Sequence, residues 1–263
     1  METIQTQDTR YLESVGQTDK HQKLSNKYNM VNTSKVIEVF NDLGWFVSKQ
    51  QQKAVRNPEN HGFQKHLVRL QHKDMTPAVV GDTVPELILT GSHDGTSALK
   101  ISIGAYRLVC LNGLMAGETW ASESIRHVGF TYEKLDQAIK SIALNAPKLI
   151  TTIDGFKSIS LDDQEKEIFA KTAIEMIYDG DENSYSVQPR QMLYPKRWAD
   201  SNKNDLFTTF NIVQEHAIRG GVRQTRPDGS RIRSREVKSI DKNIKINQAL
   251  WSLTERMAEL KRA

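Results

Sequence analysis

The chain has 263 residues, of which 38% are hydrophobic and 26% charged, enough for one large domain or two small ones with a real core. No run of about 18 apolar residues occurs, so we expect neither a membrane span nor a membrane partner. The polar N-terminus lacks the apolar core of an export signal, and Cys110 is the only cysteine, so intramolecular disulfides are excluded and a cytoplasmic location fits best. The net charge of +4 is too small to indicate a nucleic-acid partner by itself.

Residues 1–30 are rich in Gln, Asp, Lys, Asn and Ser and show little apolar periodicity, which is typical of a flexible N-terminal arm. A short helix follows, for which Thr33 or Ser34 is the expected cap. A strand that begins at Trp45 is then expected to pair, as a hairpin, with a second strand over residues 63–70.

Three further strands are predicted, over residues 86–90, 98–103 and 106–111. The first two flank the sequence Gly-Ser-His-Asp-Gly-Thr-Ser. Within it, Asp94-Gly95 indicates a hairpin turn, because glycine adopts positive φ at low steric cost. Gly104 interrupts the apolar run and is expected to separate the last two strands. These strands form an antiparallel meander.

Helical spacing dominates after residue 131. The expected helices are 131–147, ended by Pro147, then 160–180, opened by a capping box of Ser160 and Asp163, then 205–218 and 236–261. The front half, 36–127, is β-rich and the back half, 131–263, is α-rich. We therefore expect one α+β domain over 31–263, an antiparallel β-meander packed against helices.

Basic side chains gather between the last two helices, where nine of them stand against Asp228, Glu236 and Asp241. Such a cluster can form a phosphate-binding surface, although a solvated loop and helix face would give the same pattern. The upstream segment Tyr194-Pro195-Lys196-Arg197-Trp198 alternates aromatic and basic residues, as single-strand binders do. The candidate nucleic-acid-binding residues are Lys196, Arg197, Trp198, Arg219, Arg223, Arg226, Arg231, Arg233, Arg235, Lys238 and Lys242, with Lys245 completing the basic run.

No familiar catalytic motif is present: the chain lacks the phosphate-binding loop, the dinucleotide fingerprint, the nucleophile elbow, the zinc-protease helix and paired cysteines. His93 and Asp94 invite a catalytic or metal-binding interpretation, but a structural turn in which Asp94 accepts local N–H groups is favoured. Arg126-His127 suits either an anion site or an ion pair at a strand end. We therefore expect no enzyme activity, no cofactor and no metal.

The segment from Leu87 to Leu114, with the later Ser-Ile-Arg-His-Val-Gly-Phe, resembles the phage/plasmid-like proteins of domain-of-unknown-function family 932. The positions that carry the resemblance are Ser92, His93, Asp94, Gly95, Arg107, Val109, Cys110, Asn112, Ile125, Arg126 and His127. This chain has Leu-Asn-Gly-Leu where many members have Gln-Asn-Thr-Leu. The resemblance implies a mobile-element protein acting in bacterial cytoplasm, and it brings no established catalytic residues.

The order of helix, strands and helix is also similar, at the level of fold alone, to single-strand annealing proteins, which assemble as rings. This likeness implies a homo-oligomer that binds single-stranded DNA in recombination. The sequence therefore predicts a non-enzymatic nucleic-acid-binding protein of a phage or other mobile element. The alternative is a phage-encoded inhibitor that binds a host defence protein.

Overall fold

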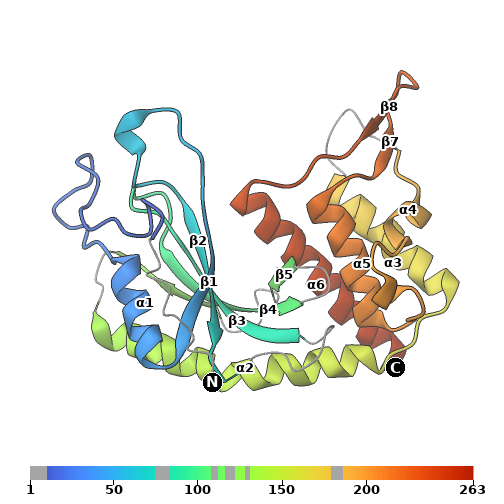
Figure 1. The fold of residues 1–263 in the computed structure, drawn as a ribbon, viewed down its shortest axis with the longest axis horizontal. Helices are drawn as coiled ribbons and strands as arrows, with labels where there is room; N and C mark the ends of the chain where they lie inside the picture. Colours follow the sequence, from blue (N-terminus) through green and yellow to red (C-terminus); the bar gives the residue numbers. More distant parts are fainter. Residues whose placement is uncertain are drawn as a thin grey trace, which may run out of the picture. The chain divides into compact units, whose positions relative to one another are not determined.

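The computed structural model describes residues 11–74, 83–107, 112–115, 122–127, 131–178 and 186–262 (Figure 1). Contacts group the chain into two compact units with interleaved segments. Unit one comprises Met1–Thr76, Glu86–Ser102 and Ser122–Ile142, and unit two comprises Pro77–Pro85, Ile103–Ala121 and Ala143–Ala263. The sequence predicted a single domain over 31–263. Periodicity could not show this division, because three of its boundaries fall inside secondary-structure elements, two in strands and one in a helix.

The described strands of the front half form an antiparallel sheet, as expected for an α+β fold. They are β1 (Trp45–Gln52), β2 (His66–His72), β3 (Thr83–Gly91), β4 (Leu99–Arg107), β5 (Asn112–Met115) and β6 (Ser122–Ile125). The order is β1-β2-β3-β4-β5, and β6 also pairs with β4. The first hairpin has the expected partners, with Trp45 opposite His72 and a register shift between Val47 and Lys49.

The turn between β3 and β4 has the chemistry that its sequence indicates. Gly95 adopts a φ of +83°. The Asp94 carboxylate accepts hydrogen bonds from Ser92 Oγ at 2.6 Å and from Thr96 N at 2.9 Å. The expected break at Gly104 is wrong, since β4 continues through it to Arg107. Gly104 pairs there with Met115, so the strand pairing is strong enough to overcome the conformational freedom of one glycine.

Helix α1 (Thr33–Asp42) is capped one position before Thr33 and two before Ser34, the two caps that the sequence suggested. Its cap is Asn32, whose side chain accepts hydrogen bonds from the backbone N–H groups of Ser34 and Lys35. The preceding residues, from 11 onward, adopt turns rather than a helix. Val15 and Tyr28 are buried among them. This part of the expected arm therefore belongs to the core of unit one, whereas its first ten residues lie outside the described part of the chain.

Helices dominate the back half: α2 (Tyr132–Lys157), α3 (Asp163–Tyr178), α4 (Pro189–Leu193), α5 (Leu206–Arg219) and α6 (Ile240–Arg262), with a short 3-10 turn at Trp198–Asp200. A second 3-10 turn, Pro58–Asn60, lies between β1 and β2 in the front half. The core of unit two is aromatic. The rings of Phe156 and Trp251 lie 5.4 Å apart, and those of Phe210 and Trp251 lie 6.0 Å apart. These contacts join α2, α5 and α6. Among the described residues, no helix combines the length and the apolar character needed to cross a membrane.

Three of the expected helix boundaries are wrong. Helix α6 begins at Ile240, four residues after the expected start at 236. Helix α2 runs through position 147 to Lys157, because the apolar stripe continues beyond it with buried Leu149 and Ile153. The capping box of α3 is formed by Asp162 and Glu165 instead of Ser160 and Asp163. Each backbone N–H of that pair donates to the other side chain, both at 2.8 Å.

Candidate nucleic-acid interface

The basic region between α5 and α6 is a two-stranded hairpin, where the sequence predicted a loop. Strand β7 (Arg223–Thr225) pairs antiparallel with β8 (Arg231–Arg233), and Arg223 lies opposite Arg233. The turn closes through Arg226 N and Ser230 O at 2.9 Å, with Gly229 at a φ of +81°. Strands of three residues are too short to be predicted from alternating polar and apolar residues. The turn motif Pro227-Asp228-Gly229 was therefore the only sequence signal of this hairpin.

The two faces of this hairpin differ sharply in composition. Gln224 is buried and Ile232, its cross-strand partner, is half-buried. Because side chains alternate along a strand, Arg223, Arg231 and Arg233 share the opposite face. All three are exposed. The hairpin therefore packs one face inward and presents a row of guanidinium groups on the other.

The guanidinium groups on this face are not neutralised within the part of the chain that the structure describes. None of Arg223, Arg231, Arg233 and Arg235 forms an ion pair there. The nearby Asp228 is held instead by Ser230 and lies beside Arg226, and these hydrogen bonds and this charge lower the pKa of its carboxyl group. Arg223 and Arg233 thus oppose each other with like charge, an arrangement that costs stability unless an anion lies between them.

The hairpin is fixed to the helices at its base. Gly220 ends α5 with a φ of +68°, and a side chain there would meet Ser234 O at 2.6 Å. Ser186 N and Thr225 O join at 3.0 Å, and Arg223 N donates to Gln191 Oε1 at 3.0 Å. These bonds tie β7 to the segment around α4 and hold the arginines on a supported ribbon.

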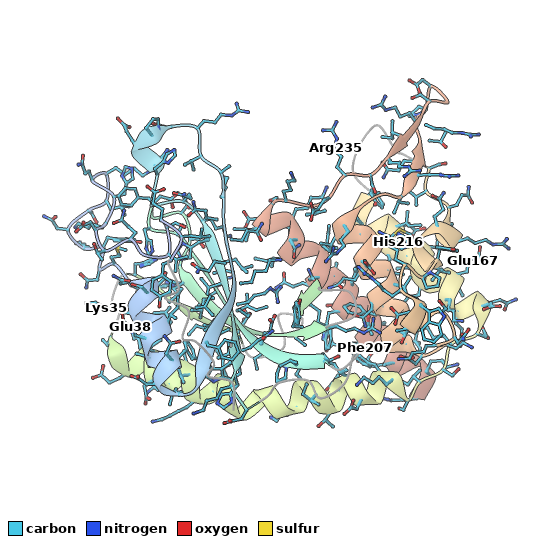
Figure 2. All side chains as sticks on the ribbon, viewed as in Figure 1. Lys35, Glu38, Glu167, Phe207, His216 and Arg235 are labelled. Carbon is cyan, nitrogen blue, oxygen red and sulfur yellow. The ribbon has the colours of Figure 1, made fainter. Side chains whose placement is uncertain are left out.

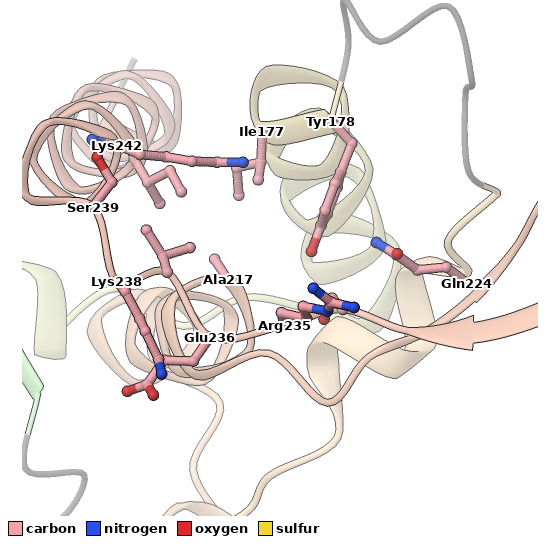
Figure 3. A pocket seen from close by; sticks show the side chains of 12 residues that line it. Ile177, Tyr178, Ala217, Gln224, Arg235, Glu236, Lys238, Ser239 and Lys242 are labelled. Carbon is pink, nitrogen blue, oxygen red and sulfur yellow. Dashed lines mark hydrogen bonds between the residues drawn. The ribbon is translucent and has the colours of Figure 1, made fainter. Parts of the chain in front are cut away.

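The other candidate cations surround this base. Arg219, at the end of α5, and Lys238, Lys242 and Lys245, before and within the start of α6, are all exposed. Arg235 follows β8 and extends from the connection to α6 (Figure 2). A pocket of about 390 Å³ opens between these elements, with Arg235, Lys238 and Lys242 in its lining (Figure 3).

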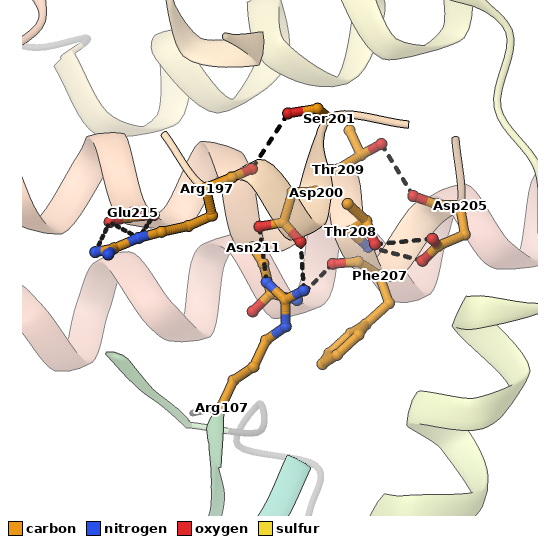
Figure 4. Close-up of polar contacts among 10 residues, drawn as sticks. All are labelled: Arg107, Arg197, Asp200, Ser201, Asp205, Phe207, Thr208, Thr209, Asn211 and Glu215. Atoms are coloured by element: carbon orange, nitrogen blue, oxygen red, sulfur yellow. Dashed lines mark hydrogen bonds and ion pairs between the residues drawn. The ribbon is translucent and has the colours of Figure 1, made fainter. Parts of the chain in front are cut away.

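The loop from Tyr194 to Trp198 divides into anchors and exposed rings. Lys196 Nζ donates to Gly220 O at 3.0 Å. Arg197 pairs with Glu215 at 2.7 Å, as Figure 4 shows. Both cations are therefore engaged within the protein and are not available to hold a phosphate as the sequence predicted. By contrast, the Trp198 side chain is 90% exposed and that of Tyr194 is 72% exposed.

A buried ion pair supports the same loop. Arg107, a position of the family resemblance, donates two hydrogen bonds to Asp200, and both side chains are almost fully buried (Figure 4). Asp200 closes the 3-10 turn that begins at Trp198. The pair thereby fixes the backbone that carries the exposed indole. Asp200 was not a candidate, because 93 residues separate it from Arg107 and no local pattern links them.

Two further positions of the family resemblance, His93 and His127, lie close together in unit one. His93 and His127 are buried together with His66, which the sequence had not indicated. The rings of His66 and His93 lie 5.1 Å apart, and Thr33 Oγ1 lies 2.9 Å from His66 Nε2. Tyr28 stacks on His127 at 4.6 Å. Burial lowers the pKa of His66 to about 4 and that of His93 to about 3, so both are neutral at pH 7.

The three histidines lie in the core of unit one, where ring contacts and hydrogen bonds surround them. Among the described residues, no group of three or more His, Cys, Asp or Glu side chains is arranged to hold a metal ion. Val31 N donates to His127 Nδ1 at 3.1 Å, which occupies one ring nitrogen. Arg126 is exposed. Asn112 begins β5, whereas Val109 and Cys110 lie outside the described residues.

Comparison with known proteins identifies the family. The profile described as "Domain of unknown function (DUF932)" matches residues 20–251. Two relatives from Escherichia coli (strain K12), UPF0380 protein YfjQ and UPF0380 protein YafZ, are each 32% identical over 248 residues, covering 94% of this chain and 89% of the relative. No solved structure gives a significant match. The chain thus belongs to the DUF932 family, as its Ser-His-Asp-Gly turn and Ile-Arg-His segment indicated.

Proposed function

We propose that the protein binds the phosphate backbone of nucleic acid through the exposed face of the β7–β8 hairpin and catalyses no reaction on it. The observation that carries the proposal is the row formed by Arg223, Arg231 and Arg233, exposed and without an ion pair among the described residues. A planar guanidinium group donates two parallel hydrogen bonds to a phosphate, so arginine suits this surface better than lysine would.

Single-stranded DNA is the form of nucleic acid that we favour. Tyr194 and Trp198 present exposed rings on the loop that Lys196 ties to the end of α5, where the hairpin begins. Bases stack on such rings with little sequence preference, provided that they are free of a partner strand. The proposed setting is a phage or other mobile element, where the protein would protect or anneal single strands during recombination, as a homo-oligomer.

The test is fluorescence anisotropy with a labelled 30-nucleotide single strand at low salt. Reversing two charges on the hairpin, Arg231→Glu with Arg233→Glu, should weaken binding at least tenfold for every sequence tried, since phosphate contacts carry no base specificity. The control is Lys53→Glu with Arg56→Glu, two exposed residues of the loop after β1 that change the net charge equally. Equal weakening by both variants would reduce the effect to net charge and contradict the proposal.

The same surface would also fit an acidic host protein, the second function that the sequence suggested. A pull-down from host lysate treated with nuclease separates the two. If a host protein is captured in stoichiometric amount after nuclease treatment, and is no longer captured by the Arg231→Glu, Arg233→Glu variant, then that protein and not nucleic acid is the partner.

A further inference from the structure

The pocket at the foot of the hairpin lies wholly within unit two. It is bounded by the end of α3, the end of α5, the connection after β8 and the first turns of α6 (Figure 3). Its volume of about 390 Å³ falls in the range of small-molecule sites, roughly 300 to 1,000 Å³. It is not part of the arginine row, and nothing in the proposed backbone contact requires it.

The lining of this pocket has two chemistries. Ile177, Val237 and Ile246 supply apolar surface, and the half-buried ring of Tyr178 stands beside them. Opposite them lie cationic groups: Figure 3 shows the Lys242 side chain crossing the pocket towards Ile177. A flat aromatic ligand flanked by negative charge would satisfy both halves.

A second observation connects the pocket to the arginine row. Arg231, Arg233 and Arg235 follow one another at two-residue intervals, about 6.6 Å apart in an extended chain. The pairing continues beyond β8, since Ser234 N donates to Val222 O at 2.8 Å. Arg235 is also a lining residue of the pocket. The line of cations therefore ends at the pocket entrance.

We infer that the pocket receives one unpaired base of a single strand whose phosphates follow Arg231, Arg233 and Arg235. The inference rests on the proposed function and specifies its substrate: a strand with bases free to leave the stack. Glu236 also lines the pocket, which disfavours an inorganic polyanion inside it and suits a base with hydrogen-bond donors at its edge. A duplex would have to unpair and flip a base to fill the site.

Filling the pocket tests this assignment without removing a buried side chain. Lys242 is exposed and lines the pocket, whereas Lys245 is exposed and does not. Lys242→Trp would place a ring where the base is expected, and Lys245→Trp makes the same change in charge and side chain outside the pocket. Each protein is measured against two 30-nucleotide strands, one with bases and one abasic, which have equal numbers of phosphates.

We expect the unchanged protein and Lys245→Trp to bind the strand with bases about tenfold more tightly than the abasic strand, since a stacked base contributes about that factor or more. In Lys242→Trp this preference should fall several-fold. If Lys242→Trp keeps the full preference, the bases are read on Tyr194 and Trp198 instead, and the pocket assignment is overturned.

Other outcomes separate this inference from the proposed function. If the strand with bases and the abasic strand bind equally tightly, and both bind with strong salt dependence, the result supports backbone binding and contradicts the base pocket. Failure of either strand to bind in a salt-dependent way would overturn the proposed function itself. Thymidine monophosphate serves as a competitor: if it binds Lys245→Trp but not Lys242→Trp, and does so more tightly than the strand, the ligand is a free nucleotide and the strand assignment is wrong.

Discussion

Arg223 lies directly opposite Arg233 across the β7–β8 hairpin, and both side chains are exposed. Like charges in directly opposed positions destabilise a two-stranded sheet by a few tenths of a kcal/mol up to about 1 kcal/mol. Against this repulsion, Ser186 N donates to Thr225 O and Gln191 Oε1 accepts from Arg223 N, which anchors β7 to the segment around α4. Ser234 and Val222 exchange two further hydrogen bonds where the hairpin meets the helices. A bound phosphate would remove the repulsion, which is why we regard the pair as a binding feature.

Arg223→Glu should make the protein more stable and weaken its binding to single-stranded DNA. The new glutamate would face Arg233 and turn a repulsive pair into an attractive one, raising the free energy of unfolding by about 0.5 kcal/mol. Affinity for single-stranded DNA should fall at least tenfold in the same protein. Thermal unfolding and anisotropy on one preparation measure both. A variant that is less stable, or that binds normally, would show that the pair has no such role.

Arg107→Met should destabilise unit two strongly, because it leaves the Asp200 carboxylate buried without its partner, at a cost of about 3 to 5 kcal/mol. Arg107→Met combined with Asp200→Leu should recover much of this loss, since no buried charge is left. Urea denaturation gives the values. Lys140→Met, which breaks an exposed pair with Asp136, serves as the control and should cost under about 1 kcal/mol. If Arg107→Met costs no more stability than Lys140→Met, the Asp200 carboxylate is hydrated in the folded protein.

Stability should fall on acidification because of the histidine cluster. Folding lowers the pKa of His66 to about 4 and that of His93 to about 3, below the value of about 6.5 in an unfolded chain. Between these values the unfolded chain binds more protons, so the free energy of unfolding decreases as pH falls. Each of these histidines lowers the free energy of unfolding by up to about 1.4 kcal/mol for each pH unit below pH 6.5, and has almost no effect above about pH 7.

Urea denaturation at pH 7 and pH 5 measures this decrease. His93→Gln should make the pH dependence shallower, because it removes one of the two buried imidazoles that the unfolded chain protonates more readily. A stability that stays constant from pH 7 to pH 5 would mean that the cluster is accessible to water.

Gly95→Val should destabilise unit one by more than about 2 kcal/mol. The position combines a φ of +83° with a close approach, because a Cβ atom would meet Leu24 Cδ2 at 2.6 Å. Gly229→Val isolates the backbone contribution, since its φ is +81° and nothing lies within 4 Å of its Cβ position. Similar thermal unfolding of the two variants would show that Leu24 moves away freely.

The sequence predicted best where local chemistry decides the structure. Asp94-Gly95 produced its hairpin because turn and ladder preferences agree. Helix α5 lies within one residue of the predicted span 205–218 and ends before Gly220, because its apolar spacing and its glycine stop agree. The family resemblance likewise depended on a contiguous motif and was confirmed.

Prediction was poorer where distant residues or very short elements decide. Nothing near Arg107 in the sequence points to Asp200, and nothing near His93 points to His66. The hairpin has strands of only three residues, which are too short to show periodicity in the sequence. Arg197 pairs with Glu215 on the next helix, and no local pattern predicts that ion pair. Charge density along the chain showed where cations gather, but only the structure shows which ones lack a carboxylate.

The most direct test of backbone binding by the hairpin is the salt dependence of affinity for a single strand. The logarithm of the association constant should fall linearly with the logarithm of salt concentration, and replacing Arg223, Arg231 and Arg233 together with alanine should make that slope shallower by about 2, since each phosphate contact contributes about 0.7. A slope that is the same in the triple variant and the unchanged protein would contradict the account, because the three arginines would then contact no phosphate.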